Sequence, residues 1–204
     1  MSLRNPLKTY YDILKGLCSE ERGINSDTLE QAIILAIEIA REGREGREGR
    51  KIGTMFVVSD SAEVLKRSNP MILDPLVGHP ASKKYIGDHN VRETVKELAQ
   101  LDGAFIISDD GTVLSACRYI NASSRGIKLP LGLGSRHMAA ASITKQTNAV
   151  AVVASESSLV RVFDDGKIIG AIIPELWMLK YYSLQTNEPY SKRPNEKITV
   201  ASKD

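Results

Sequence analysis

Arg136 and His137 occupy positions at which a helix does not normally carry basic side chains. They fall in the first turn of the helix predicted over Ser135–Gln146, directly after a glycine-rich loop. The dipole of a helix is already positive at its N-terminus, so basic side chains there conflict with it. An anion would remove the conflict, because free N–H groups, the dipole and Arg136 would all bind it. The alternative is an exposed helix start with solvated cations, and the loop alone does not decide between the two.

The loop before this helix has the composition of a tight turn that ends in a helix cap. Gly132 and Gly134 allow the backbone to turn sharply, and Ser135 is a favourable N-cap. The Gly-Lys-Ser/Thr ending of a Walker A loop is missing from the sequence, so a phosphate site here would be of another type.

Two carboxylates fall at the ends of predicted strands. Asp102 precedes Gly103 and Ala104, which open a strand, and Glu156 follows the strand predicted over residues 149–154. Carboxylates at such positions commonly hold a divalent ion or a substrate hydroxyl. A local explanation is also available for the first of them, because Gly103 can end the preceding helix in the αL conformation.

Two other groups of charged residues have a structural explanation. Residues 104–114 and 159–169 each predict a hairpin, in which Asp-Gly supplies the positive φ of a tight turn. The aspartates there are therefore expected to be turn residues rather than catalytic pairs. The Arg-Glu-Gly triplet repeated over residues 41–49 carries as many glutamates as arginines, which favours a solvated linker.

Alternating strands and helices indicate an α/β fold, a mixed β-sheet flanked by helices. Periodic apolar residues predict helices over residues 26–41, capped by Ser26 or Asp27, and over residues 91–101, capped by Asn90. Short apolar runs predict strands over residues 53–59 and 149–154, and residues 68–90 are expected to form an irregular connection.

The chain is expected to have three parts. A helix–strand extension, residues 1–89, would pack on a core formed by residues 90–182. Residues 183–204 are polar and are expected to form a mobile tail.

Composition excludes several classes of protein. Hydrophobic residues make up 42% of the 204 residues, enough for a packed core, while the net charge of +2 argues against nucleic-acid binding. Cys18 and Cys117 match no metal or redox spacing, so buried thiols in a reducing compartment are expected. The sequence shows neither a signal peptide nor an apolar run that could cross a bilayer, which predicts a soluble, cytoplasmic protein without membrane contacts.

Several of these segments together resemble the diadenylate cyclase domain. Asp102-Gly103-Ala104 matches the Asp-Gly-Ala motif of that family, and Gly134-Ser135-Arg136-His137 resembles its Gly-Thr-Arg-His-Arg motif. The similarity continues through Thr147-Asn148-Ala149-Val150 and Ser155-Glu156, where relatives read Thr-Asp-Ala and Ser-Glu-Glu. Both main motifs occur in the right order, which is more specific than either alone.

The resemblance implies a nucleotidyltransferase that condenses two ATP molecules into the second messenger cyclic di-AMP and releases two pyrophosphates. One protomer holds one ATP, so it also implies a two-fold homodimer or higher oligomer with the nucleotides face to face. Asp102 would hold a divalent metal, Mn²⁺ or Mg²⁺, and help to activate the 3′-hydroxyl. Arg136 and His137 would be catalytic and would bind the triphosphate, with His137 also near the metal.

The other residues of the two motifs would bind the nucleotide. Gly103 and Ala104 would allow its close approach, and Gly134 and Ser135 would contact the triphosphate beside Arg136. Glu156 would belong to the nucleotide site and to the surroundings of the metal.

Three positions depart from the family pattern. Ser135 replaces a threonine but keeps the hydroxyl, and Ser157 replaces the second glutamate. Met138 replaces the second arginine, which removes a charged phosphate contact and leaves open a non-catalytic nucleotide-binding module of the same fold. The retained Asp102 argues against that module, since pure binding needs no such carboxylate. Basic residues that could replace the missing arginine lie two helical turns onward or in the preceding loop: Lys145, Arg125 and Lys128.

Overall fold

The computed structural model describes residues 23–45, 52–71, 73–157, 159–181, 190–194 and 199–203. Cys18, the end of the Arg-Glu-Gly repeat and much of the predicted tail lie outside the described residues. The chain divides into two compact units, Met1–Pro174 and Glu175–Asp204. In the second unit, β8 (Tyr190–Pro194) and β9 (Thr199–Lys203) pair as an antiparallel hairpin.

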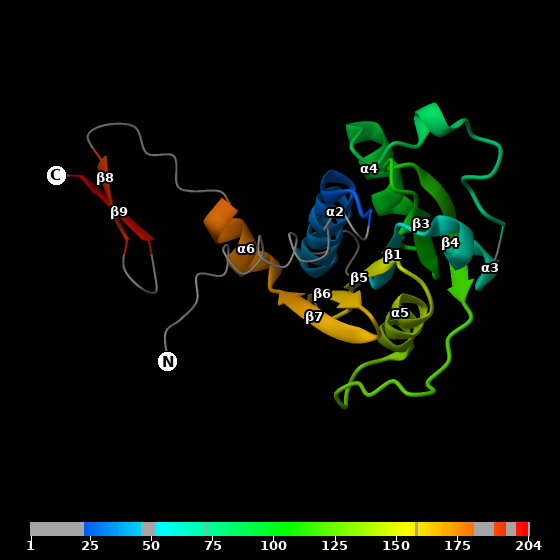
Figure 1. The fold of residues 1–204 in the computed structure, drawn as a ribbon. Coiled ribbons are helices and arrows are strands. Elements are labelled where there is room, and N and C mark those ends of the chain that lie inside the picture. Colours follow the sequence, from blue (N-terminus) through cyan, green and yellow to red (C-terminus); the bar gives the residue numbers. More distant parts are fainter. Residues whose placement is uncertain are drawn as a thin grey trace. The chain divides into compact units, whose positions relative to one another are not determined.

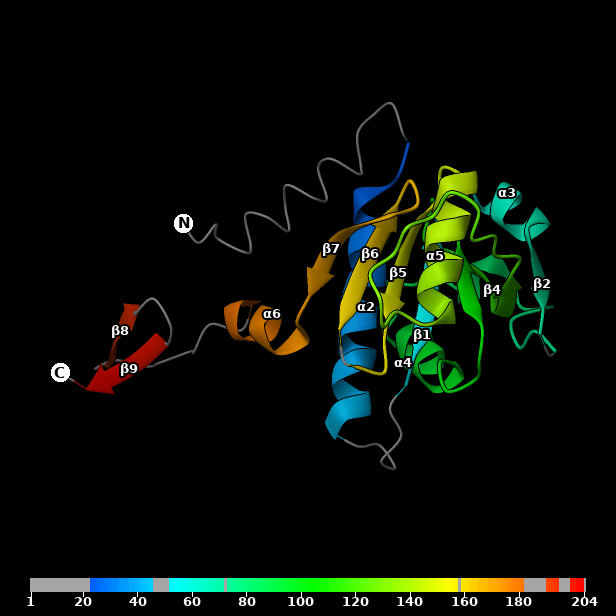
Figure 2. The ribbon, with the colours of Figure 1, turned by 90° about the horizontal axis from the view of Figure 1, so that it is seen from below.

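The first unit is built on a seven-stranded mixed sheet (Figure 1, Figure 2). Its strands are Thr54–Val58 (β1), Ser68–Pro70 (β2), Ala104–Ile107 (β3), Val113–Ile120 (β4), Val150–Ala154 (β5), Val160–Asp164 (β6) and Lys167–Ile172 (β7). They lie in the order β2-β4-β3-β1-β5-β6-β7. β1 and β3 are parallel, and the other neighbouring pairs are antiparallel. The α/β class, the mixed sheet and both predicted hairpins are thus confirmed.

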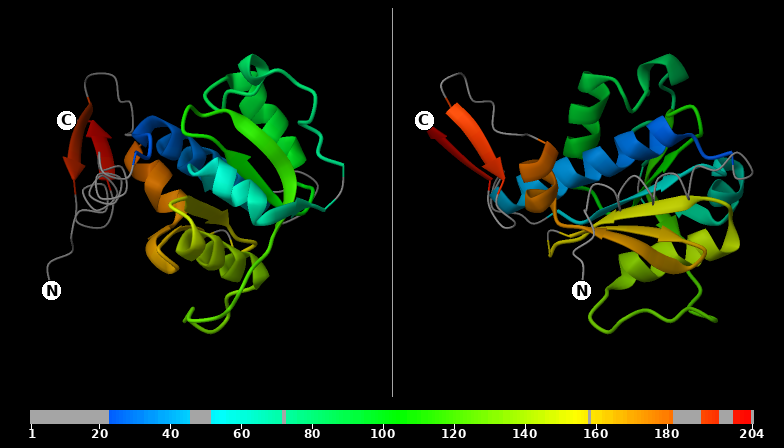
Figure 3. Two further views of the ribbon diagram at one scale, coloured as in Figure 1. Left: turned by 45° about the vertical axis from the view of Figure 1, so that its right-hand side comes forward. Right: turned by 60° about the vertical axis from the view of Figure 1, so that its left-hand side comes forward.

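Helices α2 (Ser26–Glu45) and α5 (Ser135–Gln146) cover opposite faces of this sheet (Figure 3). Side chains of a strand point alternately to its two faces. Met55 and Val57 of β1 accordingly belong to the apolar cluster beneath α5. Phe56 lies on the other face and stacks on Phe105 of β3 with their ring centroids 5.3 Å apart. The central strands β1, β3 and β5 are therefore buried on both sides.

The N-terminal helix follows the prediction in its core face but not in its ends. Its apolar residues between Leu29 and Ala40 are almost all buried, as the predicted wide apolar face requires. The cap is Asn25, whose Oδ1 accepts a hydrogen bond from the N–H of Thr28, and neither predicted capping residue has this role. α2 also continues to Glu45, into the Arg-Glu-Gly repeat. Among the described residues, no helix has the length and apolar character needed to cross a bilayer.

The segment between β1 and β3 contains more structure than the sequence indicated. Helix α3 (Ser61–Lys66), strand β2 and the 3₁₀ helix η1 (Ala81–Lys83) precede helix α4 (His89–Leu98). α4 begins earlier than predicted because Asp88, not Asn90, caps it: its Oδ1 accepts hydrogen bonds from the N–H groups of Asn90 and Val91. A further helix, α6, spans Pro174–Tyr181.

Candidate active site

Strand register brings the separate candidate segments to one end of the sheet. β1 and β3 run parallel, so Asp102, just before β3, comes to the same end as Gly53, just before β1. β5 runs antiparallel to β1, with Thr54 opposite Ala154, so Glu156 after β5 also lies at this end. Residues far apart in the sequence therefore surround the N-terminus of α5.

Arg136, in the first turn of α5, bridges the two candidate carboxylates. Its Nη2 donates to Asp102 Oδ1 at 2.8 Å, and its Nη1 lies 3.6 Å from Glu156 Oε1. The carboxylate side chains are 64% and 65% exposed, so each pair contributes only about 0–1 kcal/mol to stability. Nε of Arg136 is buried and has no hydrogen-bond partner among the described residues. The cation thus has weakly held partners that a ligand can replace.

Gly53 provides the space that this guanidinium occupies. A Cβ atom placed on Gly53 would lie 2.4 Å from Nη1 of Arg136 and 3.3 Å from Cγ of Glu156. Any side chain at position 53 would therefore push Arg136 out of its place between the carboxylates.

Asp102 is held in its charged form. The hydrogen bond from Arg136 is the main cause that lowers the pKa of its carboxyl, and a bond from the N–H of Gly103 adds to it. Gly103 has φ 114, and a Cβ there would lie 2.6 Å from the carbonyl carbon of Cys117 in β4. The glycine is needed for this close approach, and it does not end a helix, because α4 stops at Leu98.

Two hollows meet at Ser135 and Arg136. The first, of about 300 Å³, is polar and is lined by these two and by His137, Ser155 and Ser157 among others. The second, of about 230 Å³, has a carboxylate beside apolar groups, and its lining includes Met55, Asp102, Ala104, Ile120 and Met138. The first hollow suits an anionic group at a helix N-terminus, and the second suits a less polar group.

His137 lines the first hollow as a buried, neutral side chain. Burial lowers the pKa of its imidazole, and the nearby guanidinium groups of Arg161 and Arg136 lower it further. Its Nε2 lies 3.2 Å from Nη1 of Arg161, and its ring lies 6.0 Å from that of Phe163. Asp102 lines the second hollow, which shares Ser135 and Arg136 with the first.

The start of α5 differs from the prediction in its cap. The cap residue is Gly134, and Ser135 is the first helical residue, exposed at the mouth of both hollows. The N–H groups of His137 and Met138 bond to the carbonyl of Gly134 at 3.1 and 3.3 Å. A Cβ on Gly134 would meet no atom within 4 Å, so the fold alone does not require glycine there.

The basic residues that could replace the missing arginine do not line the hollows. Met138, which stands at the position of that arginine, lines the second hollow. Lys145 lies in the last turn of α5, where its Nζ donates to the carbonyl of Gly126 at 2.7 Å. The prediction that it compensates for Met138 is wrong, because Lys145 lies at the opposite end of this 12-residue helix from the first turn and the two hollows. Neither Arg125 nor Lys128 lines either hollow.

Two residues of the site were missed from the sequence. Gly53 was read only as the start of a strand, and its role depends on a contact with a helix 83 positions further on. The sequence indicates Arg161 only as part of the predicted hairpin over residues 159–169, although its charge inside the apolar run Val160–Phe163 is a signal that could have identified it.

Comparison with known proteins gives a consistent result. A family model described as DisA bacterial checkpoint controller nucleotide-binding matches residues 41–168. A diadenylate cyclase of Methanocaldococcus jannaschii is 49% identical over 162 residues, which are 79% of this chain and 49% of that protein. A diadenylate cyclase of Haloferax volcanii is 43% identical over 156 residues, 76% of this chain and 54% of that protein. The chain thus spans about half the length of the curated relatives it matches.

Solved structures show weaker similarity. DacA from Staphylococcus aureus, solved as a double mutant, is 20% identical with a TM-score of 0.48, over 77% of this chain and 96% of that one.

Proposed function

Because the chain belongs to the DisA checkpoint controller nucleotide-binding family, we propose that it is a diadenylate cyclase that joins two ATP molecules into cyclic di-AMP. The observation that carries the proposal is the position of Arg136. It lies at the N-terminus of α5, between two hollows, with carboxylates as its only ion-pair partners among the described residues. The triphosphate would occupy the first hollow and displace Glu156 from the guanidinium.

The reaction consists of two equivalent transfers. In each, the 3′-oxygen of one nucleotide bonds to the α-phosphorus of the other, and the bond from that phosphorus to its bridging oxygen breaks. Pyrophosphate leaves with the bonding electron pair, and the hydroxyl proton passes to Asp102 or to water. The lowered pKa of Asp102 keeps this carboxylate ionised and able to accept a hydrogen bond from the hydroxyl.

The side chains around Asp102 fit Mg²⁺ or Mn²⁺. Its Oδ1 accepts hydrogen bonds from Arg136 and Gly103, and among the described residues its Oδ2 accepts none. No group of three His, Cys, Asp or Glu side chains in the described part of the chain could hold a metal alone. Such a site suits an ion whose remaining ligands are phosphate oxygens and water, and the bound ion would neutralise phosphate charge.

The roles of the remaining residues follow from their positions. Gly103 and Ala104 would bound the nucleoside side of the site, and Gly134 and Ser135 the triphosphate side. Glu156 would contribute to the metal environment. His137 would bind phosphate and not metal, because its Nε2 is already occupied by Arg161.

Catalysis would require a second copy of the chain. The described part of the chain forms one such site, so the two reacting nucleotides would come from two protomers that meet with two-fold symmetry. Positioning of the two nucleotides would then supply much of the rate acceleration. A cytoplasmic location is part of the proposal, since the substrate is ATP.

Incubation of the purified protein with ATP and Mn²⁺ or Mg²⁺, followed by mass spectrometry, tests the proposal. We expect cyclic di-AMP from the wild type and none from Asp102→Asn. Tight ATP binding without product under either metal would instead indicate a nucleotide-binding module that has lost turnover through Met138. No ATP binding at all would contradict the phosphate site itself.

A further inference from the structure

Arg161, in strand β6, lies behind the first hollow and contacts two of the residues that line it. Its Nη1 is 3.2 Å from Nε2 of His137 and 3.5 Å from Oγ of Ser155. His137 comes from the first turn of α5, and Ser155 comes from the end of β5. One guanidinium thus links the two elements that border the hollow, without lining it.

This contact determines which nitrogen of His137 carries the proton. An arginine side chain can only donate hydrogen bonds, so Nε2 must be the acceptor. In the neutral imidazole the proton is then on Nδ1. Among the described residues the ring makes no other hydrogen bond, so Nδ1–H remains available to a ligand in the hollow.

Ser155 is oriented by the same network. Its Oγ lies 3.0 Å from the carbonyl of Leu159 and 2.7 Å from Oγ of Ser157. A carbonyl only accepts, so Ser155 donates its proton to Leu159 and accepts from Ser157 and from Arg161. The guanidinium thus fixes the acceptor nitrogen of His137 on one side of the hollow and donates to Ser155 on the other.

We propose that Arg161 is a positioning residue of the triphosphate site. It holds His137 as the Nδ1–H tautomer, so that the imidazole presents a hydrogen-bond donor to phosphate oxygens, and its bond to Ser155 anchors the guanidinium to the end of β5. The kinetic part of this inference rests on the proposed function, whereas the tautomer does not. Without Arg161, the ring would be free to place its proton on either nitrogen and to turn away from the ligand.

Nitrogen NMR of histidine-labelled protein tests the tautomer directly. The chain has three histidines, and His79 and His89 are both exposed and serve as internal references. At about pH 8, where imidazoles are neutral, we expect His137 of the wild type to be Nδ1–H, with His137→Gln identifying its signals. Arg161→Met should lose this preference, and Arg161→Lys should keep it, because lysine also only donates.

ATP kinetics of the same variants test the positioning role. We expect Arg161→Met to raise KM for ATP about tenfold, the loss of one well-placed hydrogen bond, with a smaller change in kcat. Arg161→Lys should recover most of the difference. Lys167→Met removes the same charge from the exposed neighbouring strand, where Lys167 pairs with Asp165, and should leave KM unchanged.

The outcomes separate the positioning role of Arg161 from the proposed cyclase activity. An Nε2–H tautomer in the wild type would overturn the inference, as would a folded Arg161→Met protein with unchanged tautomer and KM. If the wild type makes no cyclic di-AMP, the NMR result still decides the tautomer, and the Kd for ATP replaces KM. If the wild type shows the Nδ1–H tautomer and Arg161→Met binds ATP with a higher Kd, the positioning role is supported even though the proposed cyclase activity has failed.

Discussion

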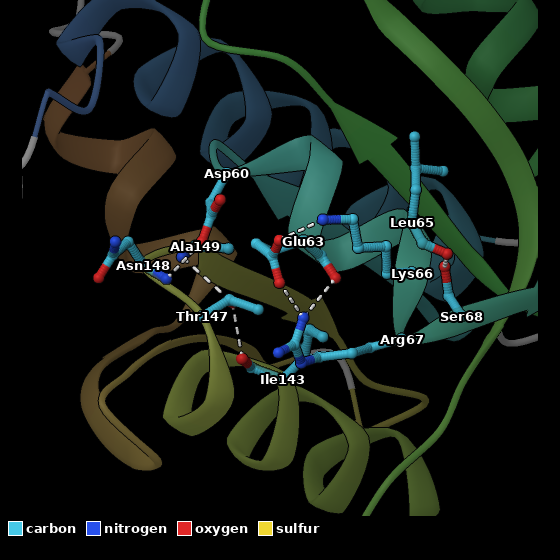
Figure 4. Close-up of polar contacts among 10 residues, drawn as sticks. All are labelled: Asp60, Glu63, Leu65, Lys66, Arg67, Ser68, Ile143, Thr147, Asn148 and Ala149. Atoms are coloured by element: carbon cyan, nitrogen blue, oxygen red, sulfur yellow. Dashed lines mark hydrogen bonds and ion pairs between the residues drawn. The ribbon is translucent and has the colours of Figure 1, made fainter.

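The C-terminal end of α5 is held by hydrogen bonds, some to its own last turn and some to other segments (Figure 4). Thr147 Oγ1 donates to the carbonyl of Ile143 at 2.7 Å, and the N–H of Asn148 donates to Asp60 Oδ2 at 2.9 Å. Lys145 bonds to the carbonyl of Gly126 and is favourably placed for the helix dipole. At the N-terminal end, by contrast, a glycine caps the helix without a side chain, and Arg136 opposes the dipole.

The difference shows which end of the helix the fold uses for its own stability. The C-terminal hydrogen bonds satisfy carbonyl and N–H groups that would otherwise be unpaired. The N-terminal end has a buried Nε without a partner among the described residues, exposed carboxylates and two hollows. An unfavourable cation beside open space is what a site for an anionic ligand requires. The two ends should therefore respond differently to matched substitutions.

The largest expected effect is on Arg136. Arg136→Met should lower kcat/KM for ATP by about 100-fold or more, because it removes a charge aimed at the phosphates. Lys145→Met, a matched loss of charge at the other end of the same helix, should leave kcat/KM within about twofold while lowering stability by about 0.3–1 kcal/mol. Steady-state kinetics and urea unfolding measure both. Equal losses of activity in the two variants would show that the ends do not differ in function.

A smaller effect is expected from Gly53→Ala, which disturbs Arg136 without removing it. The added methyl group would displace the guanidinium, and we expect kcat/KM to fall about tenfold, since small misplacements at a site are costly. In an Arg136→Met background the same change should cost nothing further. Additive losses in the double variant would mean that Gly53 acts independently of Arg136.

Asp60 should affect stability only. Its φ of 45 lies in the left-handed region, and its carboxylate accepts the bond from Asn148. Asp60→Ala should lower the free energy of unfolding by about 2 kcal/mol, from the strain on alanine and the lost hydrogen bond. Asp60→Asn should lose less, because asparagine tolerates this conformation. The prediction is wrong if either variant loses turnover at temperatures at which it is still fully folded.

The smallest expected effect is a pH dependence of stability due to His137. The pKa of its imidazole is lowered in the folded state, mainly by burial. At pH values between the folded pKa and the unfolded value of 6.5, the unfolded chain therefore binds more protons than the folded one. Stability should be complete above pH 6.5 and should fall as the pH decreases toward the folded pKa. His137→Gln should flatten this slope in urea titrations between pH 5 and 7.5. A slope that persists in His137→Gln would have to come from other groups.

The sequence was sufficient for elements marked by local signals. α5 has the predicted bounds, and the Asp-Gly hairpins form because the turn residues determine them locally. The helix caps were misplaced where several capping residues occur together, as at Asn25 to Asp27, because propensity alone does not choose among them.

The candidate site was predictable only where motifs identify it. The start of a helix and the start of a strand single out Arg136 and Asp102, the resemblance adds their roles, and the structure adds the hydrogen bond between them. Gly53 and Arg161 act through long-range register, which single-sequence patterns do not contain. The expectation for Lys145 failed because a shared helix face does not place two residues at the same end.

The most direct test of the central claim is the binding of 3′-deoxy-ATP, which lacks the attacking hydroxyl and so separates binding from turnover. Isothermal titration calorimetry with Mg²⁺ would compare the wild type with Arg136→Met and Lys145→Met. The account predicts micromolar-range binding that is lost in Arg136→Met and kept in Lys145→Met. Undiminished binding to folded Arg136→Met would contradict the assignment of the triphosphate to the N-terminus of α5.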